Sequence, residues 1–418
     1  MTLDELKNKK IVVVGLGVNN KYLATYLKNK GVFFEVIESW NSFDELNNKL
    51  KSFEVIFRTP GLPFMSEPVQ QALKAGVEVN SQTKLFFDLC PCPIIGVTGT
   101  KGKGTVSSLI YRIIEKSGKK KVWLAGNIGH DPFEFLDQIK PNDLVILELS
   151  SFQLQDLHKS PQIAVVLNVS EDHIDKSKTK QRATHYSFEE YSDAKMQIIK
   201  YQTEHDFALL GPDVPKSYKD SGLGKKIFID DKKAHWLDAK LLGKHNLFNI
   251  AAAAEVANLL GIDEKSIKDA VSEFEGLPFR MQDLGEIKSV RVINDGFSTN
   301  PQATIAAISA FSTPVILIIG GFDKGFDYID LTDVIKKTKY IKGVVVTGEV
   351  TSQILEKLEG YRGQIKNGAK DIKEIVDQAF VLAKPRDTII FSPGTSSFDM
   401  FKNETDRAEK FTRTVKNL

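Results

Sequence analysis

The segment GTKGKGT, residues 99–105, combines three glycines with two lysines and two threonine hydroxyls. It follows an apolar run that predicts a strand and precedes an amphipathic run that predicts a helix. A glycine-rich loop in this position turns backbone N–H groups toward a phosphate at a helix N-terminus, where the helix dipole favours negative charge. Lys103 could then reach the terminal phosphates of a nucleotide, and the Thr105 hydroxyl could bind Mg²⁺.

The loop departs from the usual spacing of a phosphate-binding loop, G-x-x-x-x-G-K-[ST]. Val97 stands where the first glycine would be, and Gly104 separates Lys103 from Thr105. A chance glycine-rich turn therefore remains an alternative for this segment taken alone.

Two other predicted strands lead into groups that bind metal ions or move protons. The strand at 144–147 runs directly into Glu148, and a carboxylate in that position can bind Mg²⁺ beside a phosphate loop. The strand at 163–167 is followed by an acidic cluster that contains His173, which is either a structural hydrogen-bonding residue or a metal ligand. Lys195 lies near the start of a predicted helix, where spacing alone indicates a surface cation.

The elements that must position these groups recur along the chain. Apolar strands run into glycine turns at 11–17 and 315–321, as they do at the phosphate loop. Strands that alternate with amphipathic helices predict parallel sheets in doubly wound α/β domains, with ligands beyond the carboxyl ends of the strands. Stiff connectors at 88–93 and 276–278 predict domain boundaries between 1–89, 90–281 and 282–418.

The first glycine turn is not a complete dinucleotide fingerprint. Gly15 and Gly17 are present, but Asn20 stands where the third glycine would be. Glu38, at the end of the second predicted strand, could hold a ribose hydroxyl or could be a solvated strand-end acid. An NAD-dependent oxidoreductase would need its chemistry in this domain, where no candidate catalytic residue is found.

The bulk composition excludes several classes of protein. The 418 residues carry a net charge of +2, with 42% hydrophobic and 26% charged residues, as in ordinary globular proteins. We therefore expect neither a nucleic acid nor a membrane partner. Two cysteines, Cys90 and Cys92, make neither a zinc site nor a disulfide framework, and no signal peptide is evident, so we expect a cytoplasmic protein. No segment indicates an interface, and we expect a monomer.

Further motifs occur in a fixed order over about residues 10–411. They are GTKGKGT (99–105), GNIG (126–129), ELSSFQL (148–154), LNVSEDHID (167–175), DAK (193–195), GKHNLFNIAAA (243–253), GLPFR (276–280), NDGFSTNP (294–301), GGFDKG (320–325) and SPGTSSFDMFKN (392–403). Together they resemble the Mur ligase family, ATP-dependent amino-acid ligases of peptidoglycan precursor synthesis. The likeness is greatest to the members that add glutamate to UDP-N-acetylmuramoyl-L-alanine.

The resemblance implies an α/β fold of three domains: a Rossmann-like domain, a central ATPase domain with a mostly parallel sheet, and a second Rossmann-like domain. It implies ATP and two Mg²⁺ sites as cofactors, with carbamylated Lys195 as a metal ligand. The implied catalytic residues are Lys103, Glu148, His173 and Lys195, and the implied metal ligands are Thr105, Glu148, His173 and Lys195. The implied ATP-binding residues are Gly99, Thr100, Lys101, Gly102, Lys103, Gly104, Thr105, Asn246, Asn249, Arg280 and Asp295.

The first domain would bind the UDP substrate, which accounts for its incomplete dinucleotide pattern. The implied contacts to UDP-N-acetylmuramoyl-L-alanine are Gly15, Gly17, Val18, Asn19, Glu38, Gly61 and Asn127. The reaction implied by the family passes the γ-phosphoryl group of ATP to the alanyl carboxylate. The amine of glutamate then attacks the resulting acyl phosphate.

The amino-acid pocket departs from the family pattern. Phe297 occupies the place of a lysine that meets a glutamate carboxylate in the D-glutamate enzymes, and Glu404 replaces an aromatic residue. Lys324 and Ser397 remain as candidate glutamate contacts. We expect D-glutamate as the substrate; the alternatives are L-glutamate followed by an epimerase, and a nucleotide-binding relative without catalysis. The Gly104-Thr105 order resembles folylpolyglutamate synthetase, but ELSSFQL and GNIG argue against that activity.

Overall fold

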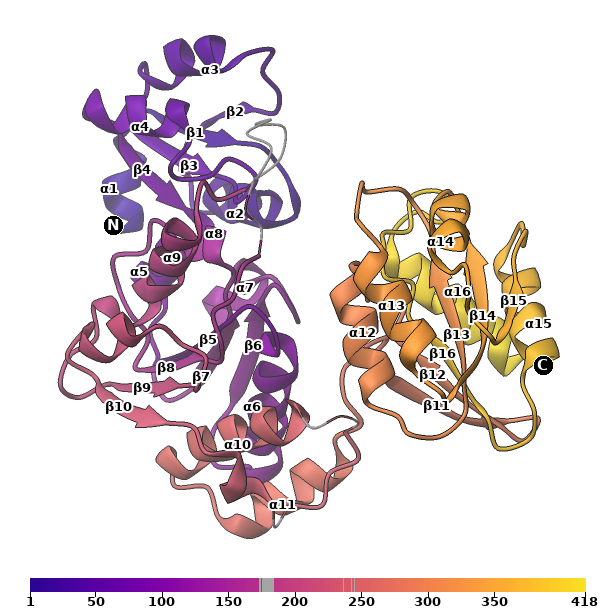
Figure 1. Ribbon diagram of the computed structural model, residues 1–418. Coiled ribbons are helices and arrows are strands. Elements are labelled where there is room, and N and C mark those ends of the chain that lie inside the picture. Colours follow the sequence, from indigo (N-terminus) through magenta and orange to yellow (C-terminus); the bar gives the residue numbers. More distant parts are fainter. Residues whose placement is uncertain (173, 175–183, 236, 242, 244) are drawn as a thin grey trace. The chain divides into compact units, whose positions relative to one another are not determined.

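The computed structural model describes residues 1–172, 174, 184–235, 237–241, 243 and 245–418 (Figure 1). The chain forms two compact units. Unit 1 contains residues 1–238 and 247–272, and unit 2 contains residues 239–246 and 273–418. Unit 1 holds two sheets and unit 2 holds one.

The first sheet of unit 1 has four parallel strands in the order β2-β1-β3-β4. Strand β1 is buried along its whole length, whereas the edge strand β2 is largely exposed and ends just before Glu38, as the sequence predicts. The strands are β1 (Ile11–Val14), β2 (Glu35–Ile37), β3 (Val55–Arg58) and β4 (Glu78–Ser81). The helices are α1 (Leu3–Lys7), α2 (Val18–Asn29), α3 (Phe43–Leu50), α4 (Glu67–Lys74) and α5 (Gln82–Leu89).

The second sheet is entirely parallel, in the order β10-β9-β8-β5-β7-β6, so the phosphate-loop strand β5 lies at its centre. Its strands are β5 (Ile94–Thr98), β6 (Val122–Gly126), β7 (Leu144–Glu148), β8 (Ile163–Val166), β9 (Phe207–Leu210) and β10 (Lys225–Phe228). The helices are α6 (Lys103–Ser117), α7 (Pro132–Phe135), α8 (Ser151–Leu154), α9 (Phe188–Lys200), α10 (His245–Leu259) and α11 (Glu264–Glu273). Short 3₁₀ helices are η1 (Leu136–Gln138), η2 (Lys216–Asp220) and η3 (Asp231–Ala234).

Unit 2 contains a six-stranded sheet in the order β11-β12-β16-β13-β14-β15, with only β11 antiparallel to its neighbour. Its strands are β11 (Gln282–Ile287), β12 (Val290–Asn294), β13 (Val315–Gly320), β14 (Ile341–Thr347), β15 (Gln364–Lys366) and β16 (Thr388–Phe391). The helices are α12 (Pro301–Ser309), α13 (Ile329–Lys337), α14 (Thr351–Lys357), α15 (Ile372–Leu382) and α16 (Glu404–Lys416).

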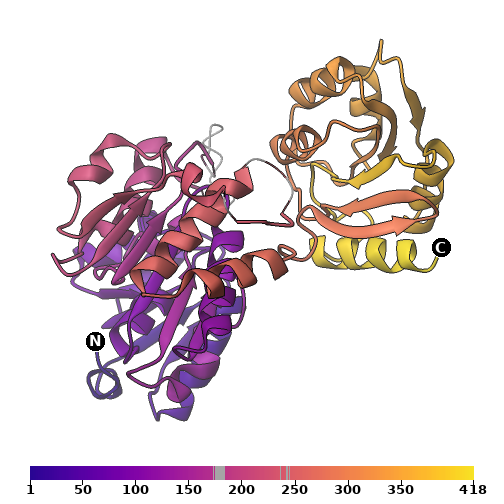
Figure 2. The same ribbon diagram turned by 90° about the horizontal axis from the view of Figure 1, so that it is seen from below.

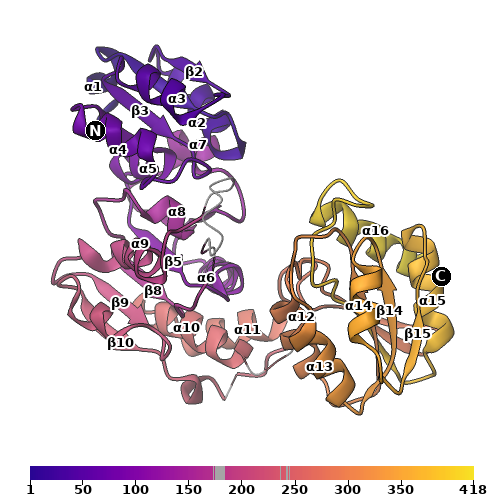
Figure 3. The same ribbon diagram turned by 45° about the horizontal axis from the view of Figure 1, so that its top comes forward.

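The sheet of unit 2 has a hydrophobic core on each face. Leu317 and Ile319 of β13 pack with residues of α12, α13 and α14, while Ile316 and Ile318 pack with residues of α15 and α16. Helices α12 and α13 lie side by side (Figures 1 and 3), and α16 runs along β11 and β12 (Figure 2). This double coverage explains why β13 is a continuous apolar run, as buried parallel strands are.

These observations confirm the predicted fold class, an α/β protein with mostly parallel sheets. Glycine turns at the carboxyl ends of β1, β5 and β13 lie where ligands bind in such sheets. Within the described ranges, no helix has the length and apolar character needed to cross a bilayer.

A buried ion pair joins the two sheets of unit 1. Arg58 of β3 donates from Nη2 to Asp156 Oδ1 at 2.7 Å and from Nε to Asp156 Oδ2 at 3.0 Å. Arg58 Nη2 also donates to the carbonyl of Phe152 at 2.7 Å, and the Ser81 hydroxyl donates to Asp156 at 3.3 Å. Both partners of the ion pair are almost completely buried. The pair therefore fixes the ELSSFQL segment to the first sheet.

Replacing Arg58 by Met should destabilise unit 1 strongly, because Asp156 would remain buried without its cation. Breaking a buried ion pair costs about 3–5 kcal/mol. Urea unfolding monitored by circular dichroism would measure the loss. Arg112→Met, which removes an exposed pair with Glu115, is the matched control and should change stability by less than about 1 kcal/mol. Equal effects of the two substitutions would contradict this account of how the sheets are joined.

Candidate active site

The phosphate loop connects β5 to α6 and depends on two glycines. Gly99 and Gly102 have φ angles of +151° and +87°, which L-residues with side chains rarely adopt. A Cβ on Gly102 would also lie 2.6 Å from Asn249 Oδ1 of α10. Lys103 and Thr105 belong to the first turn of α6, where backbone N–H groups have no partner inside the helix. The loop can therefore present N–H donors to an anion.

The segment that follows β8, the neighbour of β5 in the sheet, forms hydrogen bonds with the phosphate loop. The carbonyl of Asn168 accepts from Thr100 N at 2.9 Å, and its side-chain oxygen accepts from Lys101 N at 2.8 Å. The Asn168 amide donates back to the Lys101 carbonyl at 3.1 Å. Tyr191 of α9 lies within hydrogen-bond distance of the Thr100 hydroxyl, at 3.0 Å. The sequence analysis assigned no role to Asn168 or Tyr191.

Two lysines meet at one carbonyl of the loop. Lys103 Nζ donates to Gly99 O at 2.9 Å and to Thr100 O at 3.1 Å. Lys195 Nζ also donates to Gly99 O at 2.9 Å, and it lies 3.5 Å from the Thr98 hydroxyl. The structure thus brings together the two lysines that the family resemblance singled out.

Lys195 is not the surface cation that spacing alone indicated. Helix α9 begins at Phe188, so Lys195 lies in its second turn, on the buried face beside Tyr191 and Ile198. Only 2% of Lys195 is exposed. Burial, followed by the charge of Lys103, lowers the pKa of Lys195 to about 7, although Asp172 and Glu148 act in the opposite direction. Near neutral pH a large share of this amine is therefore uncharged.

Glu148 ends β7, the other neighbour of β5, and is buried. Its carbonyl accepts the Asn127 backbone N–H at 3.1 Å, which places the GNIG turn beside the strand-end acid. His173 lies outside the described residues. Among the residues that are described, no three His, Cys, Asp or Glu side chains form a group arranged to hold a metal ion.

A buried histidine that the sequence analysis did not assign connects α8 to α9. His185 Nε2 lies 2.8 Å from the Ser151 hydroxyl, and its Nδ1 lies 3.2 Å from Glu190. The imidazole ring also stacks on Phe152 at 4.5 Å. These contacts fix the segment that follows Glu148 to the helix that carries Lys195.

Most of the residues predicted to bind the UDP substrate lie along the first sheet, and three of them are glycines that meet one threonine. Gly15, Gly17 and Gly61 all approach Thr59, and Gly15 has a φ of +73°. The Gly15 N–H donates to Ile37 O at 2.7 Å, at the end of the strand that precedes Glu38. Glu38 is exposed. The backbone of Val18 and Asn19 opens α2, and Asn127 lies at the second sheet.

Unit 2 carries the remaining predicted nucleotide residues. The Asp295 carboxylate is buried and accepts hydrogen bonds from Ser298, from Ser392 at 2.8 Å and from Met281 N at 3.1 Å. Burial raises its pKa above the ordinary range, against the effect of these hydrogen bonds. Arg280 is exposed and its guanidinium lies 5.4 Å from the centre of the Phe297 ring.

Asn246 is buried in unit 2 and Asn249 is buried in unit 1, so the two predicted adenine contacts belong to different units.

The predicted glutamate residues follow β13 and β16. Lys324 is exposed in the GGFDKG turn, whereas Ser397 is completely buried. Glu404, one of the two departures from the family pattern, is the first residue of α16 and is partly buried. Phe297, the other departure, is partly buried and stacks on Phe279 with ring centres 5.8 Å apart.

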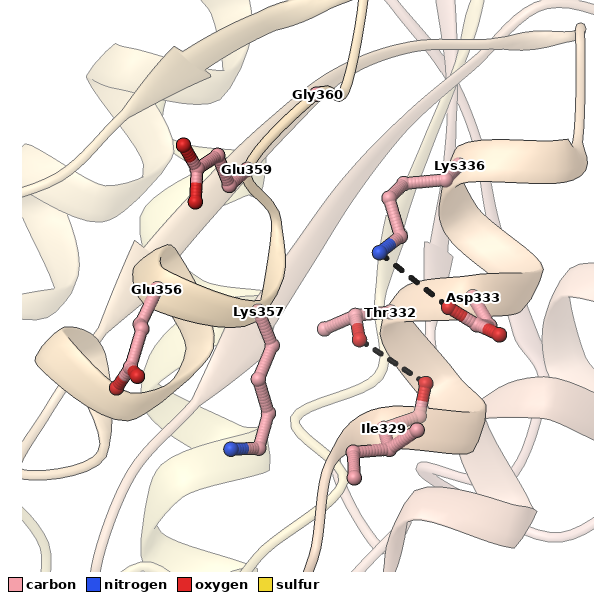
Figure 4. A pocket seen from close by; sticks show the side chains of 8 residues that line it. All are labelled: Ile329, Thr332, Asp333, Lys336, Glu356, Lys357, Glu359 and Gly360. Atoms are coloured by element: carbon pink, nitrogen blue, oxygen red, sulfur yellow. Dashed lines mark hydrogen bonds and ion pairs between the residues drawn. The ribbon is translucent and has the colours of Figure 1, made fainter.

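An open pocket of about 430 Å³ lies between α13 and α14 (Figure 4). Of its two lysines, Lys336 is paired with Asp333 at 3.3 Å. It contains none of the predicted site residues, and we do not treat it as the active site. Its lining residues are Ile329, Thr332, Asp333, Lys336, Glu356, Lys357, Glu359 and Gly360.

Parallel sheets and a glycine-rich loop between a central strand and a helix define an α/β protein of the phosphate-loop type. Residues 97–222 match the Mur ligase middle domain, and residues 279–394 match the Mur ligase glutamate ligase domain. The chain belongs to the Mur ligase family. This confirms the family resemblance found in the sequence.

Two relatives show how far the similarity extends. The UDP-N-acetylmuramoylalanine–D-glutamate ligase of Acetivibrio thermocellus is 32% identical over 470 residues, which cover 99% of this chain and 97% of that protein. The enzyme of the same name from Ruminiclostridium cellulolyticum is 33% identical over 467 residues, covering 99% and 98%.

Solved structures show the shared fold. The MurF ligase of Thermotoga maritima, in complex with ADP, matches with a TM-score of 0.60 and 18% identity over 100% of this chain and 97% of that chain. The UDP-N-acetylmuramate–alanine ligase MurC of the same organism matches with a TM-score of 0.58 and 16% identity, covering 98% and 100%.

The buried amine of Lys195 should make stability depend on pH. The unfolded chain holds this proton up to the ordinary pKa of 10.5, whereas the folded chain releases it near 7. Between these values the unfolded state binds more protons, so the free energy of unfolding rises with pH, by at most about 1.4 kcal/mol per pH unit. Below pH 7 both states are protonated and the cost of the buried charge is fully present.

Urea unfolding at pH 7, 8 and 9 in buffers free of carbon dioxide would measure this effect. The wild-type protein should gain stability relative to Lys195→Met as the pH rises. The matched control is Lys200→Met, an exposed lysine on the same helix, which should leave the pH dependence unchanged. Parallel curves for wild type and Lys195→Met would contradict the shifted pKa.

Proposed function

We propose that the protein is an ATP-dependent ligase that joins glutamate, as the D-isomer, to UDP-N-acetylmuramoyl-L-alanine through an acyl phosphate. The observation that carries the proposal is the meeting of Lys103 and Lys195 at the Gly99 carbonyl, with Glu148 on the adjacent strand. This arrangement suits phosphoryl transfer, which depends on positioning and on cations that neutralise phosphoryl oxygens. The names of the two bacterial relatives support the substrates.

The loop fits a nucleoside triphosphate. Its glycines leave room where side chains would clash, and the first turn of α6 offers backbone donors. Lys103 Nζ now donates to two loop carbonyls, and an entering phosphate oxygen would be a stronger acceptor for the same ammonium. We assign Gly99, Thr100, Lys101, Gly102 and Gly104 to the same phosphates. Asn246, Asn249, Arg280 and Asp295 complete the proposed ATP contacts.

The donor set fits Mg²⁺, which prefers oxygen ligands. Thr105, Glu148 and His173, with a modified Lys195, would hold two ions, which neutralise charge on the transferred phosphoryl group when bound. The uncharged amine of Lys195 can attack carbon dioxide and lose one proton, giving an N-carboxylate. This modification replaces a buried cation by an anionic oxygen ligand. Burial makes it accessible near pH 7 by lowering the pKa of the amine.

The acceptor substrate, UDP-N-acetylmuramoyl-L-alanine, would lie between the glycine turn after β1 and the phosphate loop after β5. We assign Gly15, Gly17, Val18, Asn19, Glu38 and Gly61 to the UDP group and Asn127 to the sugar. Asn127 is joined through its backbone to Glu148, so a sugar bound there would bring the alanyl carboxylate toward the phosphate loop. The matching domain division would be 1–89, 90–281 and 282–418, in a cytoplasmic monomer.

Lys324 and Ser397 are the proposed glutamate contacts. Because Phe297 provides no charge, the pocket has lost one cation relative to the family pattern. A charge-assisted hydrogen bond contributes roughly 1.5–3 kcal/mol, so this loss bears on the choice of isomer. The second candidate function is therefore the same ligation with L-glutamate, followed by an epimerase.

Phosphate release from ATP with UDP-N-acetylmuramoyl-L-alanine should require an amino acid, and D-glutamate should support it best. The assay compares D-glutamate, L-glutamate and no amino acid. Turnover with the L-isomer alone would establish the second candidate. Glu148→Gln, which removes the strand-end charge, should reduce turnover at least about 100-fold and serves as the test of the site. No turnover with either isomer would refute the proposal.

Replacing Lys195 by Ala should also abolish turnover, and short carboxylic acids such as acetate should restore part of it. The acid would occupy the space of the lost side chain and supply the missing carboxylate oxygen. Lys103→Ala, assayed with the same acids, is the matched control and should not recover. Recovery of neither variant, or of both equally, would contradict carbamylation of Lys195.

A further inference from the structure

Unit 2 contains a buried arginine for which the proposed reaction has no role. Arg407 of α16 is 2% exposed, and burial lowers its pKa to about 10, so it remains charged at neutral pH. Nη1 donates to Thr395 O at 2.9 Å and Nη2 donates to Gly296 O at 2.9 Å. Within the described part of the chain, no carboxylate forms a hydrogen bond or ion pair with it, and its Nε has no partner.

A buried cation that donates its hydrogen bonds to carbonyl oxygens rather than to a carboxylate is costly. Glu404 and Asp399 are the acids whose charges act on Arg407, and both do so without contact. If stability alone mattered, we would expect an apolar residue at position 407, or a carboxylate bonded to the arginine. The cost suggests that the charge serves something outside its own contacts.

Arg407 lies under the carboxyl edge of the sheet. Strands β12 and β16 are parallel neighbours, and each leads into one of the carbonyls that Arg407 binds. We call the segments that follow them the Gly296 loop (295–298) and the Thr395 loop (393–397). A Cβ on Gly321, in the turn after β13, would lie 3.4 Å from Arg407 Nη1. One guanidinium therefore joins two loops and lies near the turn after β13, at the edge where ligands bind in such sheets.

Two buried hydroxyls belong to the loop whose carbonyl Arg407 binds. Among the described residues, the Ser396 and Ser397 hydroxyls have no hydrogen-bond partner, although both side chains are completely buried. Native proteins rarely leave such groups unsatisfied unless water or a ligand serves them. The donation to Thr395 O also polarises the Thr395–Ser396 peptide, which strengthens the N–H of Ser396 as a donor. These features together favour an anion at the Thr395 loop.

We propose that Arg407 positions the amino-acid site and selects for an anionic side chain. From inside unit 2 it holds the Gly296 and Thr395 loops in place, and its charge favours a substrate carboxylate at the serine hydroxyls. The proposal rests on the proposed ligase function and adds the residue that gives the site its preference for glutamate. Arg407 itself does not touch the reacting atoms.

The test measures kcat and KM for D-glutamate and for D-glutamine, whose side chain carries no charge. ATP affinity and thermal stability are measured for the same variants. Arg407→Met should raise KM for glutamate about tenfold or more and reduce the preference for glutamate over glutamine by a similar factor. ATP affinity should change less than KM for glutamate, because the phosphate loop belongs to unit 1 and Asp295 is the one proposed ATP contact in a loop that Arg407 holds. Arg413→Met, an exposed arginine on the same helix, is the matched control.

Arg407→Lys separates the effect of the positive charge from the effect of bonding to both loops. It should keep most of the preference for glutamate, because the charge remains, but raise KM severalfold, because an ammonium cannot span two carbonyls as a guanidinium does. If Arg407→Met does not fold, this variant decides: a change confined to KM for the amino acid supports the proposal.

Equal losses in kcat, KM and ATP affinity, or an unchanged glutamate preference, would show a purely structural arginine and overturn the inference. Absence of turnover in the wild-type protein would instead refute the ligase function, and the inference with it.

Discussion

The geometry of the active edge depends on how the phosphate loop is held between β5 and β8. Asn168, which follows β8, clamps the loop through hydrogen bonds with the backbone of Thr100 and Lys101. This clamp orients the Gly99 carbonyl toward the interior, where Lys103 and Lys195 converge on it. Without the clamp, two cations would not be held around one carbonyl, and burial would not bring the pKa of Lys195 into the neutral range.

Burial and function are coupled at Lys195 because the same desolvation that disfavours its charge makes the amine reactive. A surface lysine would be almost fully protonated near pH 7 and could not attack carbon dioxide efficiently. Tyr191 and Ile198, on the same face of α9, exclude water and so set this chemistry. The contacts of His185 with Ser151 and Glu190 hold that helix against the segment after Glu148. The packing of α9 against the hydrophobic core is thus what lowers the pKa of the Lys195 amine.

The sequence allowed prediction of what is encoded locally. The phosphate loop, the strand-end position of Glu148 and the alternating α/β pattern are each visible within a few residues, and the structure has all three. The position of Asn168 against the loop was not predictable, because it depends on the pairing of β8 with β5, two strands that are far apart in the chain. Lys195 was wrongly placed on the surface because a lysine in an amphipathic helix is usually solvated, whereas the packing of α9 puts it on the buried face with Tyr191 and Ile198. Arg407 gave no signal, since an arginine in an amphipathic helix is usually solvated.

The two units solve the problem of buried charge in different ways. In unit 1 the excess cation can be removed, because Lys195 can lose its proton near neutral pH, and the proposed reaction with carbon dioxide would then give an anion. In unit 2 the cation cannot be removed, because a guanidinium remains protonated, and Arg407 is offset only by the carbonyls of the Gly296 and Thr395 loops. A substrate carboxylate would offset it further, which makes ligand binding and stability of this unit parts of the same balance. The selectivity of the site would then come from Arg407, which is buried behind the two loops, rather than from a cation on their surface.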